Sequence, residues 1–353
     1  MQTLQAFRKL FDQHLTAVLH TQIRASCKLT SDPHIQDIIE YAGTVALSGG
    51  KRLRPYLAWT MYRAFGGTSS RRILDTLTSL ELFHVFGLMH DDIIDHGTSR
   101  HGIPTAHNVV ATRLTTQRRR GDIAHVAEGQ AMLLGDLIFA WVTNILHTSL
   151  TDAAIARRVS SRFYSMVNEV VVGQMLDVDL MTRAVATSQL VDEKMRLKTA
   201  SYTFVRPMQI GTALAGAPTT YDRFCDTFGT ALGLAFQIQD DLFDLTLSAK
   251  QLGKTIFSDL ADCQHTLFTQ YIFDHGTPAH KKQLASLFGA TLSEKDRPRI
   301  TQLFTESGAL AHGQQCMNTH FDAAAHAVHK ARLPEHTKQE LLTLVTYIRH
   351  RTA

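Results

Sequence analysis

The sequence predicts an all-α protein built as one domain, and three observations lead to this prediction. Apolar residues recur at intervals of three and four along nearly the whole chain, as in Leu4, Phe7, Phe11 and Leu15. No segment shows the alternation of apolar and polar residues that is typical of a strand. No linker rich in Pro, Gly or Ser interrupts the helical pattern, so residues 1–353 are expected to form a single domain.

Turn residues divide the chain into roughly ten to twelve expected helices. The breaks are Asp32-Pro33, Gly49-Gly50, Gly66-Gly67 followed by Ser69-Ser70, Gly97 to Pro104, Pro218, Gly276 to Pro278, and Pro334. The most apolar stretch, 131–150, contains Asp136 and Asn144. We therefore expect a buried helix there and no transmembrane segment.

Composition narrows the class of protein. Hydrophobic residues make up 44% of the chain and charged residues 19%, which excludes a disordered or fibrous protein. The net charge of +4 comes without a long basic stripe, so no nucleic-acid partner is expected. Four widely spaced cysteines indicate free thiols, and the charged residues within 1–19 rule out a signal peptide. Together these features predict a cytoplasmic protein.

Two acidic pentads, each reading DDxxD, end long apolar helical patterns. They are Asp91-Asp92-Ile93-Ile94-Asp95 and Asp240-Asp241-Leu242-Phe243-Asp244. On a helix, the three carboxylates of a pentad project within an arc of about 100°. Carboxylates this close repel one another unless divalent metal neutralises them, and magnesium accepts such ligands together with water and substrate phosphates.

A single pentad is most often a solvated helix end, but two copies with the same spacing favour a functional site. We expect the two helices to face each other across a cleft that holds metal ions and a diphosphate. The segment 49–55, which reads GGKRLRP, offers a tight glycine turn and three basic residues for a phosphate, or else a solvated basic turn. His84 lies two helical turns before Asp91 and on the same face, either as a site residue or as a core histidine.

Five motifs together resemble a known family. They are Gly49 to Pro55, the first pentad followed by Arg100, Gly173-Gln174-Met175-Leu176-Asp177, Lys198-Thr199, and Phe236-Gln237 leading into Asp240. In this order, from about 44 to 260, the chain resembles the trans-isoprenyl diphosphate synthases, also called polyprenyl synthetases. Within that family it is most similar to bacterial geranylgeranyl diphosphate synthases.

The resemblance implies a helical bundle around a deep cavity, a homodimer, and the condensation of isopentenyl diphosphate with an allylic diphosphate. It implies about three Mg²⁺ ions in each active site. It also implies roles for individual residues: Asp91, Asp95, Asp240 and Asp244 as metal ligands, with Asp92 and Asp241 supporting them; Lys51, Arg54, His84 and His101 for isopentenyl diphosphate; Arg100, Lys198 and Lys254 for the allylic diphosphate; and Thr199 and Gln237 near the developing cation.

The chain departs from the family pattern at two positions. His101 stands where the family usually has a second arginine, and Gln264 stands where a lysine usually follows Ser258-Asp259-Leu260. Both changes remove positive charge from the expected diphosphate sites, although a protonated His101 can still donate hydrogen bonds.

Product length is expected to depend on residues upstream of the first pentad. Phe86 lies five residues before Asp91 and Gly87 lies four before it. In related enzymes a bulky side chain at these positions acts as a floor, so the resemblance points to a product of twenty carbons, with fifteen as the alternative. Phe83 shares a helical stripe with Gly87 and Asp91, and we expect it to form part of the floor. Both aromatics could instead be ordinary core residues.

Three functions are compatible with these residues. A prenyl diphosphate synthase, of the geranylgeranyl or farnesyl type, uses both pentads and the basic segment. A class I terpene cyclase needs metal and one diphosphate but has no use for Lys51, Arg54 and His84. A non-catalytic subunit of a heteromeric synthase would tolerate loss of pentad carboxylates, and none is lost here. The first function is therefore the prediction.

Overall fold

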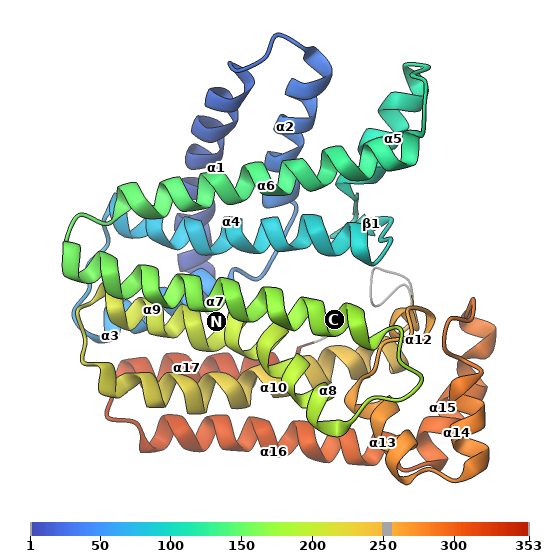
Figure 1. Cartoon of the computed structure of the whole chain (residues 1–353). Coiled ribbons are helices and arrows are strands. Elements are labelled where there is room, and N and C mark those ends of the chain that lie inside the picture. The colour runs from blue at the N-terminus through green and yellow to red at the C-terminus, as the bar shows by residue number, and fades with distance from the viewer. Residues whose placement is uncertain (1, 249–255, 352–353) are drawn as a thin grey trace. The chain divides into compact units, whose positions relative to one another are not determined.

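The computed structural model describes residues 2–248 and 256–351, and most of them are helical (Figure 1). This confirms the prediction of an all-α protein. The chain divides into two compact units. The N-terminal unit comprises Gln2–Trp59 and Gly67–Arg157, and the C-terminal unit comprises Thr60–Gly66 and Arg158–Ala353.

The N-terminal unit holds long helices and one very short hairpin. Its elements are α1 (Gln2–Cys27), α2 (Pro33–Leu47), the start of α3 (Leu53–Ala64), α4 (Arg71–Ile94), β1 (Ser99–Arg100), β2 (Ile103–Pro104), α5 (Ala106–Thr116), α6 (Ile123–Ser149) and the first turn of α7 (Ala153–Leu180). The antiparallel pair of β1 and β2 corrects the expectation that the chain has no strands. Strands of two residues are too short to show an alternating pattern.

The C-terminal unit holds most of α7 and all later elements. These are α8 (Ser188–Lys194), the π-helix η1 (Met195–Val205), α9 (Arg206–Leu214), the 3₁₀-helix η2 (Thr219–Tyr221), α10 (Asp222–Thr246), α12 (Ser258–Ala261), α13 (Leu267–His275), α14 (Pro278–Ala285), the 3₁₀-helix η3 (Glu294–Asp296), α15 (Arg297–Glu306), α16 (Ala309–Lys330) and α17 (Glu335–Arg349). The described residues thus form sixteen α-helices, more than expected. Helices of one or two turns, such as α12, are too short for an apolar period to reveal them.

Capping residues explain where several helices begin. Pro33 opens α2, where its missing N–H costs no hydrogen bond, and the Asp32 side chain accepts a hydrogen bond from Ile35 N at 3.1 Å. Ser70 caps α4 in the same way. Pro278 opens α14. These three predicted breaks therefore coincide with helix starts.

Helices α4 and α6 lie side by side and form the centre of the N-terminal unit (Figure 1). Among the described residues, α6 alone is long and apolar enough to cross a membrane by length and composition, and 44% of its most apolar window is buried. A core helix of a globular unit passes the same test. Its buried side chains, Leu134, Ile138 and Val142 among them, follow the spacing of one helix face, as predicted for a buried helix.

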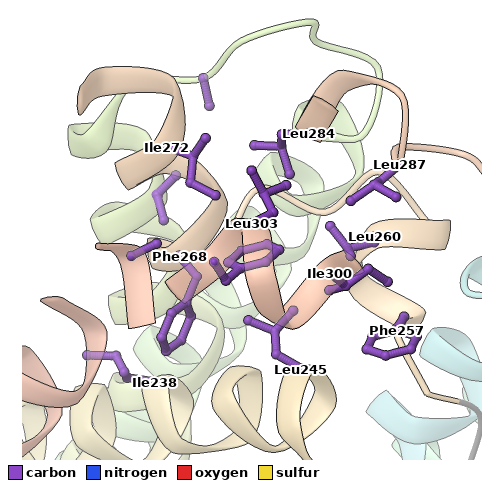
Figure 2. Packing of buried hydrophobic residues seen from close by; sticks show 14 of the residues in the cluster. Ile238, Leu245, Phe257, Leu260, Phe268, Ile272, Leu284, Leu287, Ile300 and Leu303 are labelled. Atoms are coloured by element: carbon purple, nitrogen blue, oxygen red, sulfur yellow. The ribbon is translucent and has the colours of Figure 1, made fainter. Parts of the chain in front are cut away.

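A hydrophobic cluster in the C-terminal unit holds the end of α10 in place (Figure 2). Ile238 and Leu245, on either side of the second pentad, are 1% and 5% exposed. They pack in one cluster with residues of α12, α13 and α15, including Leu260, Phe268 and Leu303. Full burial of such side chains contributes roughly 1.5–3 kcal/mol each. The pentad is therefore carried by a rigid part of its unit.

Candidate active site

The second pentad ends α10 and presents its three carboxylates differently. The side chain of Asp240 is 42% exposed, whereas Asp241 is 6% exposed and Asp244 is 1% exposed. The C-terminal end of a helix carries a partial negative charge, so carboxylates placed there are destabilised unless cations compensate them. The structure supplies such compensation from two directions, a guanidinium and a lysine cluster.

Arg351 contacts the exposed carboxylate of the second pentad. Its Nη2 lies 2.5 Å from Asp240 Oδ1, and its Nε donates to Gln239 Oε1 at 2.6 Å. The guanidinium stacks over the Phe236 ring at 3.9 Å and is only 5% exposed. A planar, stacked guanidinium with several acceptors is held in one orientation, so it fixes the position of Asp240 in turn.

Asp241 lies at the end of a hydrogen-bond chain. It accepts from Gln237 Nε2 at 2.7 Å, and Gln237 Oε1 accepts from Thr199 Oγ1 at 2.6 Å. Burial raises the pKa of Asp241 to about 7, because Lys194 and Gln237 offset it only partly while Asp240 raises it further. At pH 7 this carboxyl is therefore about half protonated, and a metal cation beside it would favour the ionised form.

Asp244 has its oxygens directed to the segment that follows the pentad. Its Oδ1 accepts from Ser258 Oγ at 2.9 Å and from Ser258 N at 3.2 Å, and its Oδ2 accepts from Asp259 N at 3.3 Å. A carboxylate at these amides stabilises the start of α12. Its predicted role as a metal ligand stays a prediction, and these contacts describe a structural role beside it.

The π-helix η1 carries Lys198 and Thr199 between α7 and α10. A Cβ on Gly173 of α7 would lie 2.6 Å from Lys198 N, and a Cβ on Gly233 of α10 would lie 2.4 Å from Ala200 Cα. Both distances are shorter than real Cβ contacts, so only glycine permits this approach. These two glycines thus allow the backbone of η1 to pack closely against α7 and α10. π-Helical turns inside α-helices occur frequently at functional sites.

A buried carboxylate joins two lysines next to η1. Lys194 Nζ lies 2.9 Å from Asp177 Oδ1, and Lys198 Nζ lies 2.5 Å from Asp177 Oδ2. Burial alone would raise the pKa of Asp177, but the two ammonium groups lower it below its usual value. Asp177 is therefore ionised at neutral pH, and the three groups together carry one net positive charge.

The first pentad ends α4 in the N-terminal unit. Asp91 and Asp95 are partly exposed, whereas Asp92 is 4% exposed. Arg100 Nε donates to Asp92 Oδ1 at 2.6 Å. Burial raises the pKa of Asp92 even though Arg100 opposes the shift. The pentad therefore offers two accessible carboxylates and one inner carboxylate held by an arginine.

In the basic segment before α3, Arg52 is buried, whereas Lys51 and Arg54 are partly exposed. Arg52 turns inward: it is 5% exposed, its Nη1 donates to Glu81 at 2.7 Å, and its Nε donates to Asp12 at 2.8 Å. Lys51 and Arg54 are partly exposed. Arg52 therefore ties the segment to α1 and α4, which leaves Lys51 and Arg54 as the residues predicted to hold a diphosphate.

Two histidines lie among these arginines. Burial lowers the pKa of His84 well below its usual value, and Arg54 and Arg100 lower it further. The pKa of His101 is also lowered, by burial and by Arg100, although much of the His101 side chain is exposed. Both rings are therefore neutral at neutral pH in the absence of an anionic ligand.

Aromatic side chains fill the space beneath the first pentad. Phe86 lies 5.5 Å from Phe83 and 5.1 Å from Phe139 of α6, measured between ring centroids. It also contacts the ring of His90 at 4.7 Å. By contrast, a Cβ on Gly87 would have no heavy atom within 4 Å. Open space thus adjoins Gly87, and the preceding residue, Phe86, belongs to the aromatic cluster.

The donor chemistry of both pentads fits magnesium. In the parts of the chain that the structure describes, no three His, Cys, Asp or Glu side chains converge as a metal site. Magnesium does not require that, because it binds through one or two carboxylates and completes its shell with water and phosphate oxygens. The accessible Asp91, Asp95 and Asp240 suit this mode, and the raised pKa of Asp241 marks a place that a cation would stabilise.

Comparison with known proteins decides the family. Residues 33–307 match the polyprenyl synthetase family. The chain belongs to the polyprenyl synthetase family. A geranylgeranyl diphosphate synthase of Sulfolobus acidocaldarius is 30% identical over 252 residues, which is 70% of this chain and 71% of the relative. A geranylfarnesyl diphosphate synthase of Aeropyrum pernix is 26% identical over 84% of this chain and 89% of the relative.

A solved structure of the same family has a very similar fold. The geranylgeranyl pyrophosphate synthase of Corynebacterium glutamicum, crystallised with isoprenyl diphosphate and magnesium, matches with a TM-score of 0.92. It is 27% identical and the match covers 99% of both chains. The family prediction made from the five motifs is thereby confirmed.

Within each unit the structure brings together some of the predicted polyprenyl synthetase residues. Thr199, Gln237 and Asp241 form one hydrogen-bond chain, and Arg100 contacts the first pentad. Lys254 lies outside the described residues. The role of each residue remains a prediction.

Three residues next to the predicted site were missed: Asp177, Lys194 and Arg351. Arg52 was one of the three basic residues expected to bind a phosphate, but the structure pairs it with Glu81 and Asp12. Asp177 lay within a quoted motif, so spacing pointed to it without giving a role. Nothing in the local sequence of Lys194 or Arg351 signals a site, because the partners of Arg351 are more than 100 positions away and two of those of Lys194 are about 70 away.

Proposed function

We propose that this polyprenyl synthetase condenses isopentenyl diphosphate with dimethylallyl, geranyl and farnesyl diphosphate and forms geranylgeranyl diphosphate with release of diphosphate. Farnesyl diphosphate is the alternative product. The observation that carries the proposal lies in the C-terminal unit, where Thr199 and Gln237 form a hydrogen-bond chain that ends on Asp241 of an intact acidic pentad. Lys198, the neighbour of Thr199, is paired with Asp177. The Phe83–Phe86–Phe139 cluster favours a short product.

The residues supply what ionisation of an allylic diphosphate requires. Bound magnesium would neutralise the charge that develops on the departing diphosphate. Asp91, Asp95 and Asp240 would hold it, and Lys198 and Arg100 would bind the diphosphate oxygens directly. Thr199 and Gln237 would direct oxygen atoms towards the allylic cation. The neutral ring of His84, with Lys51 and Arg54, would hold isopentenyl diphosphate.

We further propose that the chain is one cytoplasmic domain that acts as a homodimer with about three magnesium ions per active site. The family match from 33 to 307 covers most of both units, which supports a single domain. The dimer is supported by an exposed apolar stripe on α7. Tyr164, Val171, Met175 and Val178 are 38–67% exposed and fall within about 60° on the helix.

The direct test is an assay with purified protein, magnesium, isopentenyl diphosphate and each allylic primer in turn. We expect chain elongation with all three primers and a product of twenty carbons, sized by chromatography. Omission of isopentenyl diphosphate should abolish elongation. A cyclic hydrocarbon formed in its absence would instead identify a terpene cyclase.

A second test concerns the metal. Asp91→Ala and Asp240→Ala each remove one accessible carboxylate, so elongation should slow by about 10²-fold or more, as expected for loss of electrostatic stabilisation. Asp37→Ala is a matched control, because Asp37 is an exposed aspartate of α2 that pairs with Arg113. Near-normal turnover of either pentad variant, with its fold intact, would refute the assignment of metal ligands.

A further inference from the structure

The cluster of Lys194, Asp177 and Lys198 contains a second cation, Lys194, that lies outside the Lys-Thr motif. Lys198 belongs to the Lys-Thr motif, whereas Lys194 lies four residues earlier, at the end of α8. The Lys194 side chain is 11% exposed and the Asp177 side chain 5% exposed, but Lys198 is 25% exposed. The inner lysine is thus almost enclosed, and the outer lysine reaches the surface.

Lys194 is fully engaged by acceptors. Its ammonium lies 2.9 Å from Asp177 Oδ1, donates to the backbone oxygen of His265 at 2.8 Å, and donates to Gln264 Oε1 at 3.2 Å. An ammonium has three N–H donors, and these three acceptors match them. Lys194 therefore has no donor left for a substrate, and its effect must act through its neighbours.

We infer that Lys194 is the fixed counter-ion of Asp177 that allows Lys198 to bind the allylic diphosphate. Each oxygen of Asp177 faces one lysine, so Lys198 can move to an anionic ligand while Asp177 stays paired with Lys194. Without Lys194, the same movement would leave a buried carboxylate with no cation, which is strongly unfavourable. Lys194 is thus a positioning residue. This inference rests on the proposed function.

The same geometry explains the glutamine at position 264. Gln264 is 9% exposed, and its amide oxygen accepts a hydrogen bond from Lys194. A lysine there would add a second buried ammonium beside Lys194, and like charges at this distance repel. The positive charge that position 264 lacks is present instead on Lys194, at the end of α8.

The test compares four proteins by direct binding and by kinetics. They are the wild type, Lys194→Gln, Lys194→Arg, and the double variant Lys194→Gln with Gln264→Lys. The double variant places an ammonium at position 264, next to the site of the one that was removed. Calorimetry measures the Kd of geranyl diphosphate with magnesium and without isopentenyl diphosphate. Steady-state assays measure KM for each substrate, and thermal melting reports on folding.

We expect Lys194→Gln to weaken geranyl diphosphate binding at least tenfold, which corresponds to about 1.4 kcal/mol. KM for isopentenyl diphosphate should change less than twofold. Lys194→Arg should retain most of the affinity for geranyl diphosphate. In the double variant, log Kd should return at least half of the way from the value of Lys194→Gln to that of the wild type.

Three outcomes would overturn the inference. The first is unchanged affinity in Lys194→Gln. The second is an equal loss for both substrates that follows the melting temperature, which would indicate a purely structural role. The third is a double variant that folds but binds no better than the single one. If the wild type itself neither binds nor elongates geranyl diphosphate, the proposed function fails as well, and that result is distinct from the other three.

Discussion

The charge of Asp241 depends on what is bound beside it. Its pKa of about 7 lies far above that of an aspartate in an unfolded chain, so the folded protein holds this proton more tightly. The stabilisation from the protonated carboxyl is therefore fully present below the unfolded pKa of about 3.9 and is lost as the pH rises to 7. Above pH 7 the metal-free protein contains a buried, ionised carboxylate.

Asp241→Asn should accordingly stabilise the metal-free protein, and more so at pH 8 than at pH 5. The amide cannot ionise, and its oxygen can still accept from Gln237. We expect a gain of about 1–2 kcal/mol at pH 8, measured by urea unfolding in the presence of a chelator. Gln239→Glu, which changes a buried neighbour outside the pentad, serves as the comparison. An equal effect at both pH values would mean that Asp241 titrates normally.

His101 gives a second prediction at this scale. Because its pKa is lowered, the ring gains a proton only below its usual value of about 6.5. If the charged ring binds isopentenyl diphosphate, KM for this substrate should rise as the pH rises from about 5.5 to 7.5. His101→Arg should flatten that dependence, and His96→Arg, a nearby exposed histidine, should not. An identical profile in His101→Arg and the wild type would remove His101 from the site.

At the scale of an element, α4 links the metal site to product length. Phe86 is in contact with Phe83 and Phe139, so its removal opens a passage only as far as its neighbours allow. Phe86→Ala should lengthen the product by one five-carbon unit, and Phe83→Ala in addition should lengthen it further. Gly87→Phe should shorten it to fifteen carbons, because the side chain would enter open space.

Chromatographic sizing of the products measures these three changes. Leu77→Ala is the control, since Leu77 is a fully buried residue of the same helix on the opposite side from Phe86. It should lower the melting temperature and leave product length unchanged. If all three variants and the control give the same products, the floor of the cavity lies elsewhere.

The elements also show how far the sequence alone could predict this protein. Strong periods and capping residues predicted α2, α4 and α14 at their observed starts. The π-helix could not be predicted, because its sequence has ordinary helical periodicity and its form depends on Gly173 and Gly233 from other helices. The role of Lys194 depends likewise on a residue about 70 positions away. Local patterns carry no information on such long-range contacts.

At the scale of the whole molecule, the four free cysteines match the expectation of a protein without disulfides. The exposed stripe of Tyr164, Val171, Met175 and Val178 is unusual for a helix that faces solvent. Its burial against a second copy would remove this apolar area from water.

Met175→Glu together with Val171→Glu should therefore convert a dimer into a monomer. Two carboxylates in an apolar contact lose hydration with no cation to offset the cost. Light scattering after size-exclusion chromatography measures the mass, and Thr227→Glu, at an exposed polar position of α10, is the control. A wild type that is monomeric at micromolar concentration, or a double variant that stays dimeric, would exclude this stripe as the interface.

The π-helix has one further consequence, for insertions and deletions. Each residue of an α-helix advances the chain by about 100°, and a π-helical segment accommodates more residues in each turn. Removal of one residue between Met195 and Leu197 would allow ordinary helical pairing, but it would rotate Lys198 and Thr199 by about 100° relative to the residues before them. The hydroxyl of Thr199 would then lose Gln237, and the ammonium of Lys198 would lose Asp177. A change in the length of this segment would therefore displace both side chains at once, whereas a substitution changes only one of them.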